Sequence, residues 1–294
     1  MSSQRTIRIP QTCEGFGVRS GKDITLRIQP APPNTGVVFE RADLKNRPRV
    51  RATIDSVVDT NYATTIGQGK VTVSMVEHIL AAVRGMGIDN LIVELDGPEV
   101  PIMDGSAAPF VRLLRRAKIA YQDEKRLHLV IRKPVEVSDG DRRVSLRPLS
   151  RPRLKISYTI EYPQPTPLSE SHEVEFSNGT FVREIGPART YGFVHELSAL
   201  MDMGLIKGGS FENAVVIGES GILNSEGLRF HNECVRHKIL DSIGDLSLFG
   251  MPVFGHLVAH KSGHSLNHRL ISKILKDKDS WEILPTLPRS FKEQ

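Results

Sequence analysis

The segment 230–246 constrains the fold more than any other part of the chain, because its residues repeat at helical spacing on two faces. Apolar residues follow one face. On the other face His237, Asp241 and Asp245 recur every four residues, so their side chains stack along the helix. An imidazole and a carboxylate one turn apart can hold the same divalent ion, and such a site lacks only a third ligand from elsewhere. A solvated helix face with ordinary ion pairs has the same spacing and is the commoner case, so this segment alone favours the solvated face.

Length and composition are those of an ordinary globular protein. The 294 residues are enough for one large domain or for two domains of about 120 to 170 residues, each with its own core. The hydrophobic content of 39% and the charged content of 25% are typical of soluble proteins. A net charge of +5 suits an anionic partner such as a phosphate, a nucleotide or a nucleic acid. The lysines and arginines are dispersed, however, so the charge by itself does not indicate nucleic-acid binding.

The cysteines and the N-terminus bear on the compartment. Cys13 and Cys234 are far apart and form no C-x-x-C motif, which argues against a disulfide framework and favours a reducing compartment. The first residues contain no apolar signal region, and no apolar run approaches the roughly 18 to 20 residues of a membrane-spanning helix. We therefore expect a cytoplasmic monomer without stable membrane insertion.

Each half of the chain begins with strand-like segments and continues with helical ones, which is the pattern of an α+β protein. Alternating apolar and polar residues predict strands at 5–9, 23–29, 37–39, 90–95, 127–131, 134–138, 143–146, 154–160, 172–176, 214–217 and 255–261. Helices are predicted at 73–83, after the Asp104 or Ser106 cap, at about 195–203, at 230–248 and after residue 267. The charged run at 122–126 marks a boundary. We expect a first domain at 1–123, a second at 124–276 and a polar, proline-bearing tail at 277–294.

The helix predicted at 73–83 carries the second group of candidate residues. Ser74 and Glu77 have the spacing of a capping box, which would account for Glu77 without any chemistry. His78 follows at once. Adjacent helical positions lie about 100° apart, so Glu77 and His78 can reach a shared point at the helix edge. A lone histidine in an apolar helix is more often a satisfied core residue.

The usual short catalytic signatures, such as H-E-x-x-H, G-x-S-x-G and Walker A, are absent from the sequence. The remaining candidates are dispersed along the chain: Glu77 and His78, then His237, Asp241 and Asp245, then the Lys261–His264 motif KSGH. Two histidines and one carboxylate make three protein ligands, a count that leaves a catalytic zinc ion one open position for water. A carboxylate beside a ligand is placed to take the proton of that water.

With these residues in place, the chain resembles a known family, the UDP-3-O-acyl-N-acetylglucosamine deacetylases of lipid A biosynthesis. The resemblance covers nearly the whole chain. Its motifs are SMVEH at 74–78, GIDN at 87–90, PIMDGSAAPF at 101–110, ARTYGF at 188–193, GGS at 208–210, VRHKILDSIGDL at 235–246 and KSGH at 261–264. Several long motifs in one order are very specific, and they outweigh the simpler interpretations given above.

The resemblance implies a fold and a metal site. It implies two domains of similar topology, each a β-sheet packed on two helices, with the helix layers facing each other and the metal between them. The implied ligands are His78, His237 and Asp241. The implied metal is zinc, with ferrous iron as an alternative.

The resemblance also implies a reaction, the hydrolytic deacetylation of UDP-3-O-acyl-N-acetylglucosamine to UDP-3-O-acyl-glucosamine and acetate, which is the committed step of lipid A biosynthesis. Glu77 is the implied general base. His264 is the implied general acid and is held by Asp245, while Lys238 and Thr190 assist at the polarised carbonyl. Zinc polarises the amide oxygen and activates water, but the departing amine needs a proton from a side chain.

The family carries an insert that lines a passage for the 3-O-acyl chain, and residues 195–217 correspond to it. The expected substrate-binding residues around this passage are Tyr191, Phe193, Leu197, Leu200, Met201, Ile206, Gly209 and Val216. By spacing alone these apolar residues are ordinary core, and only the resemblance favours a passage. For the uridine end of the substrate we expect Arg143, Tyr158 and Glu161.

Departures from the family pattern avoid the inferred ligands and acid-base pair. Arg19 stands where the family commonly has histidine, Ala63 where many members have cysteine, and Tyr191 where they have phenylalanine. Before the metal helix, acidic and aromatic residues of the family are replaced by His231, Asn232 and Cys234. They bear on secondary metal inhibition and on sugar packing.

Two other functions compete with the deacetylase. A basic α+β nucleic-acid-binding module would explain the net charge, but it leaves His78, His237 and His264 unexplained, and it predicts steeply salt-dependent binding. An inactive metal-binding relative is the other alternative, and the presence of both Glu77 and His264 argues against it. We therefore expect a UDP-linked acylated amino sugar as the partner, and no nucleic acid.

Overall fold

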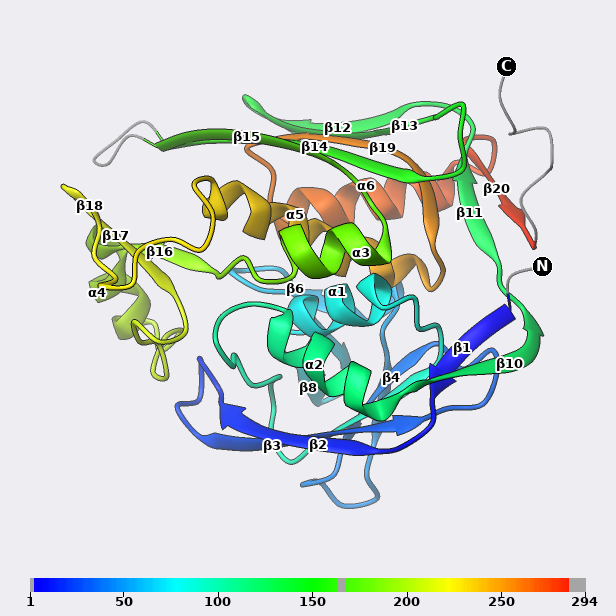
Figure 1. Cartoon of the computed structure of the whole chain (residues 1–294), viewed down its shortest axis with the longest axis horizontal. Helices are drawn as coiled ribbons and strands as arrows, with labels where there is room; N and C mark the ends of the chain where they lie inside the picture. The colour runs from blue at the N-terminus through cyan, green and yellow to red at the C-terminus, as the bar shows by residue number, and fades with distance from the viewer. Residues whose placement is uncertain (1–2, 163–167, 286–294) are drawn as a thin grey trace.

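The structure is a computed structural model that describes residues 3–162 and 168–285. It contains both helices and several β-sheets, which is compatible with the expected α+β class. Two larger sheets form outer layers, and the longer helices lie between them (Figure 1). No helix in these ranges is long and apolar enough to cross a membrane.

The first large sheet has five strands and comes from the N-terminal half. Its strand order is β2 (Gln11–Phe16), β3 (Asp23–Pro30), β9 (Leu91–Leu95), β4 (Val37–Arg41) and β5 (Arg49–Arg51). All neighbours are antiparallel except β4 and β9. Ile24, Leu26 and Ile28 alternate with more exposed residues along β3, so one face of the sheet packs on the core.

Smaller strand pairings complete this half. β6 (Val57–Asp59), β7 (Thr65–Gln68) and β8 (Val71–Val73) form a three-stranded antiparallel sheet. β1 (Ser3–Ile7) pairs with β10 (Ile119–Lys125), which connects the two halves of the chain. A short 3₁₀ turn at Ile54–Ser56 precedes β6.

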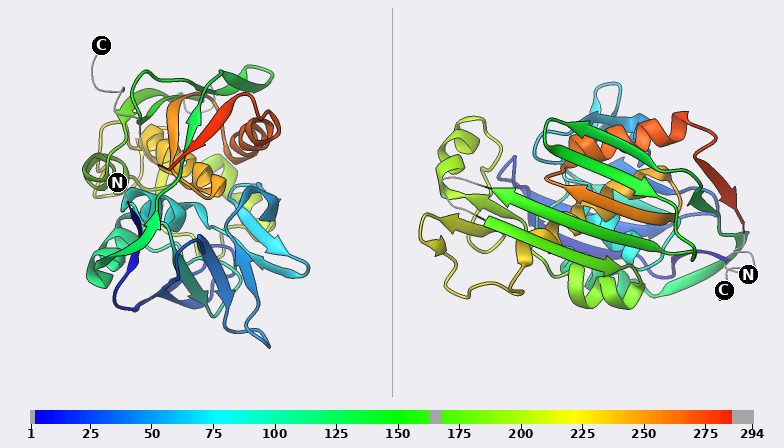
Figure 2. Two further views of the ribbon diagram at one scale, coloured as in Figure 1. Left: turned by 90° about the vertical axis from the view of Figure 1, so that its right-hand side faces the viewer. Right: turned by 90° about the horizontal axis from the view of Figure 1, so that it is seen from above.

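The second large sheet has seven strands and lies on the opposite side of the helices (Figures 1 and 2). Its main path runs through β12 (Val135–Asp139), β13 (Arg142–Arg147), β19 (Val253–His260), β11 (His128–Ile131) and β20 (Trp281–Leu284). β14 (Leu154–Tyr162) is parallel to β19, and β15 (Leu168–Glu175) is antiparallel to β14.

β20 lies inside the segment expected to be a polar tail. Its four residues pair antiparallel with β11, and the Trp281 indole N–H donates to the carbonyl of Ile274. The sequence does not reveal this edge strand, because the strand is short and polar residues flank it. Residues 286–294 of the expected tail lie outside the described residues.

Four helices occupy the space between the large sheets: α1 (Glu77–Gly85), α2 (Ala108–Ala117), α5 (Glu233–Leu246) and α6 (His264–Lys276). α1 and α5 cross at Gly244, where an added Cβ would lie 2.2 Å from the carbonyl oxygen of Glu77. Glycine is therefore required for this close approach. Further turns are α3 (Asn178–Thr180), the π-helical turn Phe181–Ile185 and the 3₁₀ turn Ser247–Phe249.

A smaller unit projects at the left of Figure 1. It consists of β16 (Tyr191–Phe193), α4 (Val194–Asp202), β17 (Val215–Gly218) and β18 (Gly221–Ile222). Its connecting loop contacts the N-terminal half, because the Gly208 N–H donates to the Val18 carbonyl at 2.9 Å. A Cβ added at Gly208 would lie 2.4 Å from the Gly17 carbonyl oxygen.

The capping box predicted at Ser74 is wrong. α1 begins at Glu77, and Val71–Val73 form strand β8 instead of the first helical turn. The Ser74 hydroxyl contacts that of Thr65 at 2.9 Å, and no side chain caps the helix. Strand pairing with β7 keeps this segment extended, and Met75, with φ of 60°, turns the chain into the helix. Glu77 is therefore not used in capping.

Candidate metal centre

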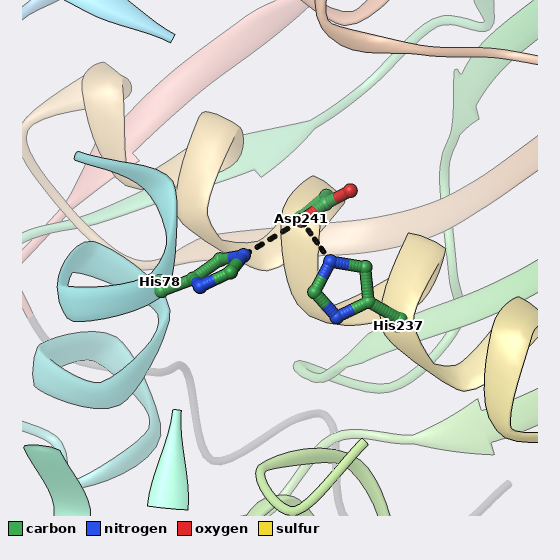
Figure 3. A group of neighbouring side chains, drawn as sticks. All are labelled: His78, His237 and Asp241. Atoms are coloured by element: carbon green, nitrogen blue, oxygen red, sulfur yellow. Dashed lines mark ion pairs between the residues drawn. The ribbon is translucent and has the colours of Figure 1, made fainter. Parts of the chain in front are cut away.

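Three buried side chains from two helices converge between the sheets (Figure 3). His78 lies at the start of α1, while His237 and Asp241 lie one turn apart on α5. Asp241 Oδ1 is 3.6 Å from His78 Nε2 and 3.2 Å from His237 Nε2. One ligand atom from each residue lies within 4.8 Å of the others, so the group can hold a metal ion.

The hydrogen bonds of this group fit a cation. Asp241 Oδ1 is buried and forms no hydrogen bond within the described residues. His237 Nδ1 is 3.1 Å from the carbonyl of Ala188 and donates to it, so the Nε2 lone pair is free to face Asp241. A buried carboxylate oxygen and an imidazole lone pair directed at one point repel each other unless a cation lies between them.

The charges around the group favour the forms that ligate metals. Burial lowers the pKa of His237, which favours the neutral ring. Burial alone would raise the pKa of Asp241, but its interactions with the His237 ring and with the Lys238 ammonium outweigh burial and hold the pKa well below its ordinary value. Lys238 Nζ donates to Asp241 Oδ2 at 2.6 Å, which leaves Oδ1 as the open ligand atom.

His264 lies beside this group at the start of α6 and is held by Asp245. Its Nδ1 is 2.9 Å from Asp245 Oδ2, while its Nε2 is 3.9 Å from Asp241 Oδ2. Burial lowers the pKa of His264, but the Asp245 carboxylate outweighs burial and raises the pKa to about 9. His264 is therefore protonated at neutral pH, with Nε2 directed toward the metal group.

Glu77 faces the same space from α1, and Thr64 connects it to the Asp245 pair. The Thr64 backbone N–H donates to Glu77 Oε2 at 3.0 Å, and the Thr64 hydroxyl donates to Asp245 Oδ1 at 2.7 Å. One residue thus orients the candidate base and the carboxylate that holds the candidate acid.

A second buried group, Asp245 with His264 and His268, also has ligand spacing. Here, however, both carboxylate oxygens are already used, since Oδ1 accepts from Thr64 and Oδ2 from Asn267 Nδ2 at 2.8 Å. His268 Nε2 adds a further contact to Asp245 Oδ1 at 3.1 Å. We interpret this group as a hydrogen-bond network and not as a metal site.

Sequence reasoning missed Thr64, Asn267 and His268. His268 follows His264 by one helical turn, and that spacing was available as a signal. Thr64 has no such signal, because it lies outside any motif and meets Asp245 across 181 residues of chain.

Most of the residues expected around the acyl passage line one cavity of about 310 Å³. The set comprises Tyr191, Leu197, Leu200, Met201, Ile206, Gly209 and Val216, together with Thr190. The cavity begins beside the metal group, because the Tyr191 ring is 6.4 Å from the His237 ring and the Lys238 ammonium is 5.9 Å from the centre of the Tyr191 ring. Phe193 is buried outside the cavity lining, where it packs on Tyr162 at 4.9 Å.

The three residues expected at the uridine end come from two strands that flank β19 in the seven-stranded sheet, but their side chains are divided between its two faces. Tyr158 pairs with Ala259 and is buried on the core face of the large sheet, whereas Arg143 pairs with His260 and is exposed on the other face. Glu161 is also exposed, 3.9 Å from His260. Strand alternation therefore separates Tyr158 from the two charged residues.

Known proteins similar to this chain match nearly its whole length. Residues 4–276 match the model of the family described as UDP-3-O-acyl N-acetylglycosamine deacetylase. A UDP-3-O-acyl-N-acetylglucosamine deacetylase of Myxococcus xanthus is 50% identical over 98% of this chain and 91% of its own length. Relatives with the same name from Geobacter sp. and Cellvibrio japonicus are 47% and 44% identical, over 99% and 96% of this chain and 95% and 93% of their own lengths.

These relatives define the class of protein, since all carry the name of a deacetylase, an amide-hydrolysing enzyme. The chain belongs to the UDP-3-O-acyl N-acetylglycosamine deacetylase family. The resemblance seen in the sequence motifs is thereby confirmed.

Proposed function

We propose that this protein is a metal-dependent hydrolase that removes acetate from UDP-3-O-acyl-N-acetylglucosamine in lipid A biosynthesis. The observation that carries this proposal is the buried set of His78, His237 and Asp241, in which Asp241 Oδ1 forms no hydrogen bond. The family and the names of the relatives support the choice of substrate.

His78, His237 and Asp241 would hold the metal. Two imidazoles and one carboxylate suit zinc, and ferrous iron accepts the same donors. When bound, such a cation polarises the amide carbonyl and makes water a stronger acid. The Ala188 carbonyl orients the His237 ring, and Lys238 neutralises Asp241 Oδ2 at the edge of the site.

Glu77 and His264 would share the proton transfers of amide hydrolysis. The oxygen of water joins the acetyl carbon, and the C–N bond breaks. Glu77, oriented by the Thr64 N–H, takes a proton from the attacking water. His264, kept protonated by Asp245, gives a proton to the departing nitrogen. Lys238 and Thr190 lie at the rim, where a carbonyl oxygen that gains negative charge would need positive charge and hydrogen-bond donors.

Substrate selection and domain organisation are part of the same proposal. We assign the 310 Å³ cavity to the 3-O-acyl chain, because its lining is mainly apolar and begins beside the metal group. We also propose that residues 1–123 and 124–276 are two domains, whose helices α1 and α5 meet at the metal site. The expectation of a cytoplasmic monomer stays a prediction.

The proposal is tested by metal analysis together with a deacetylation assay on the purified protein. Wild type should contain one tightly bound divalent ion and release acetate from the substrate, while His78→Ala, His237→Ala and Asp241→Ala should each lose metal and activity together. His231→Ala, at an exposed histidine, is the matched control and should keep both. Full metal content in one of the three variants would remove that residue from the ligand set. A metal-loaded wild type without deacetylase activity would reject the function.

A further inference from the structure

A second cavity lies at the other end of α1 from the metal group. Its volume is about 230 Å³, and its lining includes Arg51 in β5, Arg84 in the last turn of α1 and Arg126 after β10. Arg84 follows His78 by six residues, which corresponds to about 9 Å along the helix axis. Among the described residues, this cavity shares no lining residue with the cavity beside the metal group. We call it the basic cavity.

The charges in the basic cavity are not balanced. Its carboxylate, Asp89, is already occupied, since Oδ1 accepts from Arg126 Nε at 2.8 Å and Oδ2 from the backbone N–H of Arg5 at 3.0 Å. Within residues 3–162 and 168–285, neither Arg84 nor Arg51 forms an ion pair. Three guanidinium groups therefore face one carboxylate, which leaves an excess of positive charge.

Arg84 is the residue that most needs a partner. Its Nη1 is buried and has no hydrogen-bond partner in the described part of the chain. Burial, and after it the charge of Arg126, lower the pKa of Arg84 to about 10, although the charge of Asp89 opposes them. A positive charge in the last turn of a helix interacts favourably with the helix dipole, which explains why a charged residue is stable at this position. The dipole does not account for a buried donor without an acceptor, which costs free energy.

The walls of the basic cavity are held in place by neutral amides. Gln4 Nε2 donates to Asn34 Oδ1 at 2.7 Å, and Asn90 Oδ1 accepts from the Gly36 N–H at 2.9 Å. The volume is below the roughly 300–1,000 Å³ of sites for drug-sized ligands, yet it has room for a small ion and several waters. The cavity is therefore preformed and suits a small anion better than a nucleotide.

We propose that the basic cavity binds a small phosphoryl-bearing anion, with Arg84 as the principal ligand. A guanidinium presents planar N–H donors that match phosphoryl oxygens in pairs, and several arginines neutralise a dianion. The source is either free phosphate or a small phosphate ester, which share the same group.

The test is phosphate binding to the full-length protein. Calorimetric titration with inorganic phosphate, at ionic strength matched by sodium chloride, should show one site in wild type. Arg84→Gln should weaken phosphate binding at least tenfold. Arg116→Gln removes an exposed arginine from the last turn of α2 and should bind phosphate as wild type does. Arg84→Lys keeps the positive charge but removes the planar guanidinium group. This variant should fold if α1 requires only a positive charge at this position, and it should bind phosphate more weakly than wild type does.

Two comparisons complete the test. Phosphate binding should persist in His78→Ala, because the basic cavity is independent of the metal group. Glycerol 3-phosphate that binds more tightly than phosphate would identify an ester as the ligand, and binding of phosphate alone would identify the free ion. Equal phosphate affinity in wild type, Arg84→Gln and Arg84→Lys would overturn the proposal, as would binding lost only in His78→Ala.

Discussion

At the scale of single residues, the proposed mechanism assigns acid catalysis to His264, held by Asp245, and metal binding to other residues. Among the residues that the structure describes, His264 Nδ1 contacts only the Asp245 carboxylate and, at 3.3 Å, the Thr64 hydroxyl, so Nε2 is left for the proposed proton transfer to the substrate. Asp245 is fully buried and accepts from several donors, which fixes the orientation of the His264 ring. Replacement of His264 should therefore alter proton transfer and leave the metal ligands in place.

We predict that His264→Gln keeps its metal but loses kcat/KM on the order of 10²–10⁴, the usual contribution of a general acid. The acid form of His264 is present below its pKa of about 9 and is lost as the pH rises through it, so activity should fall on the basic side. A bound cation nearby opposes the imidazolium and moves this limb to lower pH.

The measurement is kcat/KM against pH with metal content determined in parallel. His268→Gln is the control, because His268 contacts Asp245 and Thr64 but forms no hydrogen bond or ion pair with Asp241 within the described residues, and its loss of rate should be smaller. A His264→Gln variant with the wild-type rate and an unchanged basic limb would show that another group, first of all Lys238, is the acid.

The site residues differ in how far the sequence could predict them. His237, Asp241 and Asp245 were accessible from helical spacing, and Glu77, His78 and His264 from their motifs. Thr64 was not, because its contacts depend on how two distant segments pack. The side chains of the uridine candidates Arg143 and Tyr158 lie on opposite faces of the sheet, since they pair with adjacent residues of β19, and local sequence patterns do not show this register.

At the scale of elements, the crossing of α1 and α5 positions the proposed metal ligands. Gly244→Ala would place a Cβ 2.2 Å from the backbone oxygen of Glu77, and backbone cannot move aside as a flexible side chain can. We predict a loss of about 1–3 kcal/mol in the free energy of unfolding, the usual cost of overpacking. Chemical denaturation of wild type and variant measures this difference in the free energy of unfolding. Gly179→Ala, at an exposed glycine of α3, should change stability little, and an unaffected Gly244→Ala would disprove the tight crossing.

The insert is the second element with a specific prediction. Each buried methylene contributes roughly 0.8 kcal/mol, so a substrate without its 3-O-acyl chain should have a much lower kcat/KM. Leu197→Trp fills the cavity from α4 and should lower kcat/KM for the acylated substrate selectively. Ser198→Trp, exposed on the same helix, should not. Equal kcat/KM for acylated and non-acylated substrates would mean that the segment is plain core.

Element boundaries show where local sequence rules fail. The predicted capping box at Ser74 has the correct residue spacing, but pairing of β8 with β7 delays the helix to Glu77. Trp281–Leu284 reads as part of a polar tail, yet it pairs with β11. In both cases a long-range backbone pairing overrides a local pattern.

At the scale of the whole molecule, the metal would join helices from distant parts of the chain. His78 and Asp241 are brought together only when α1 and α5 are packed, so a cation that binds them binds the folded state. Metal at one hundred times its Kd should raise the free energy of unfolding by about 2.7 kcal/mol. The measurement compares thermal unfolding of metal-loaded and chelator-treated protein. His78→Ala should show no shift, and equal stability of loaded and stripped wild type would contradict the prediction.

The insert is attached to the N-terminal half through main-chain atoms, with Gly208 against Gly17 and its N–H bonded to Val18. These contacts between main-chain atoms do not depend on which side chains line the neighbouring cavity. The side chains that line the cavity can therefore change without disturbing these main-chain contacts. With the cavity assigned to the acyl chain as proposed, substitutions in this wall would change the preferred acyl length and leave the proposed chemistry as it is.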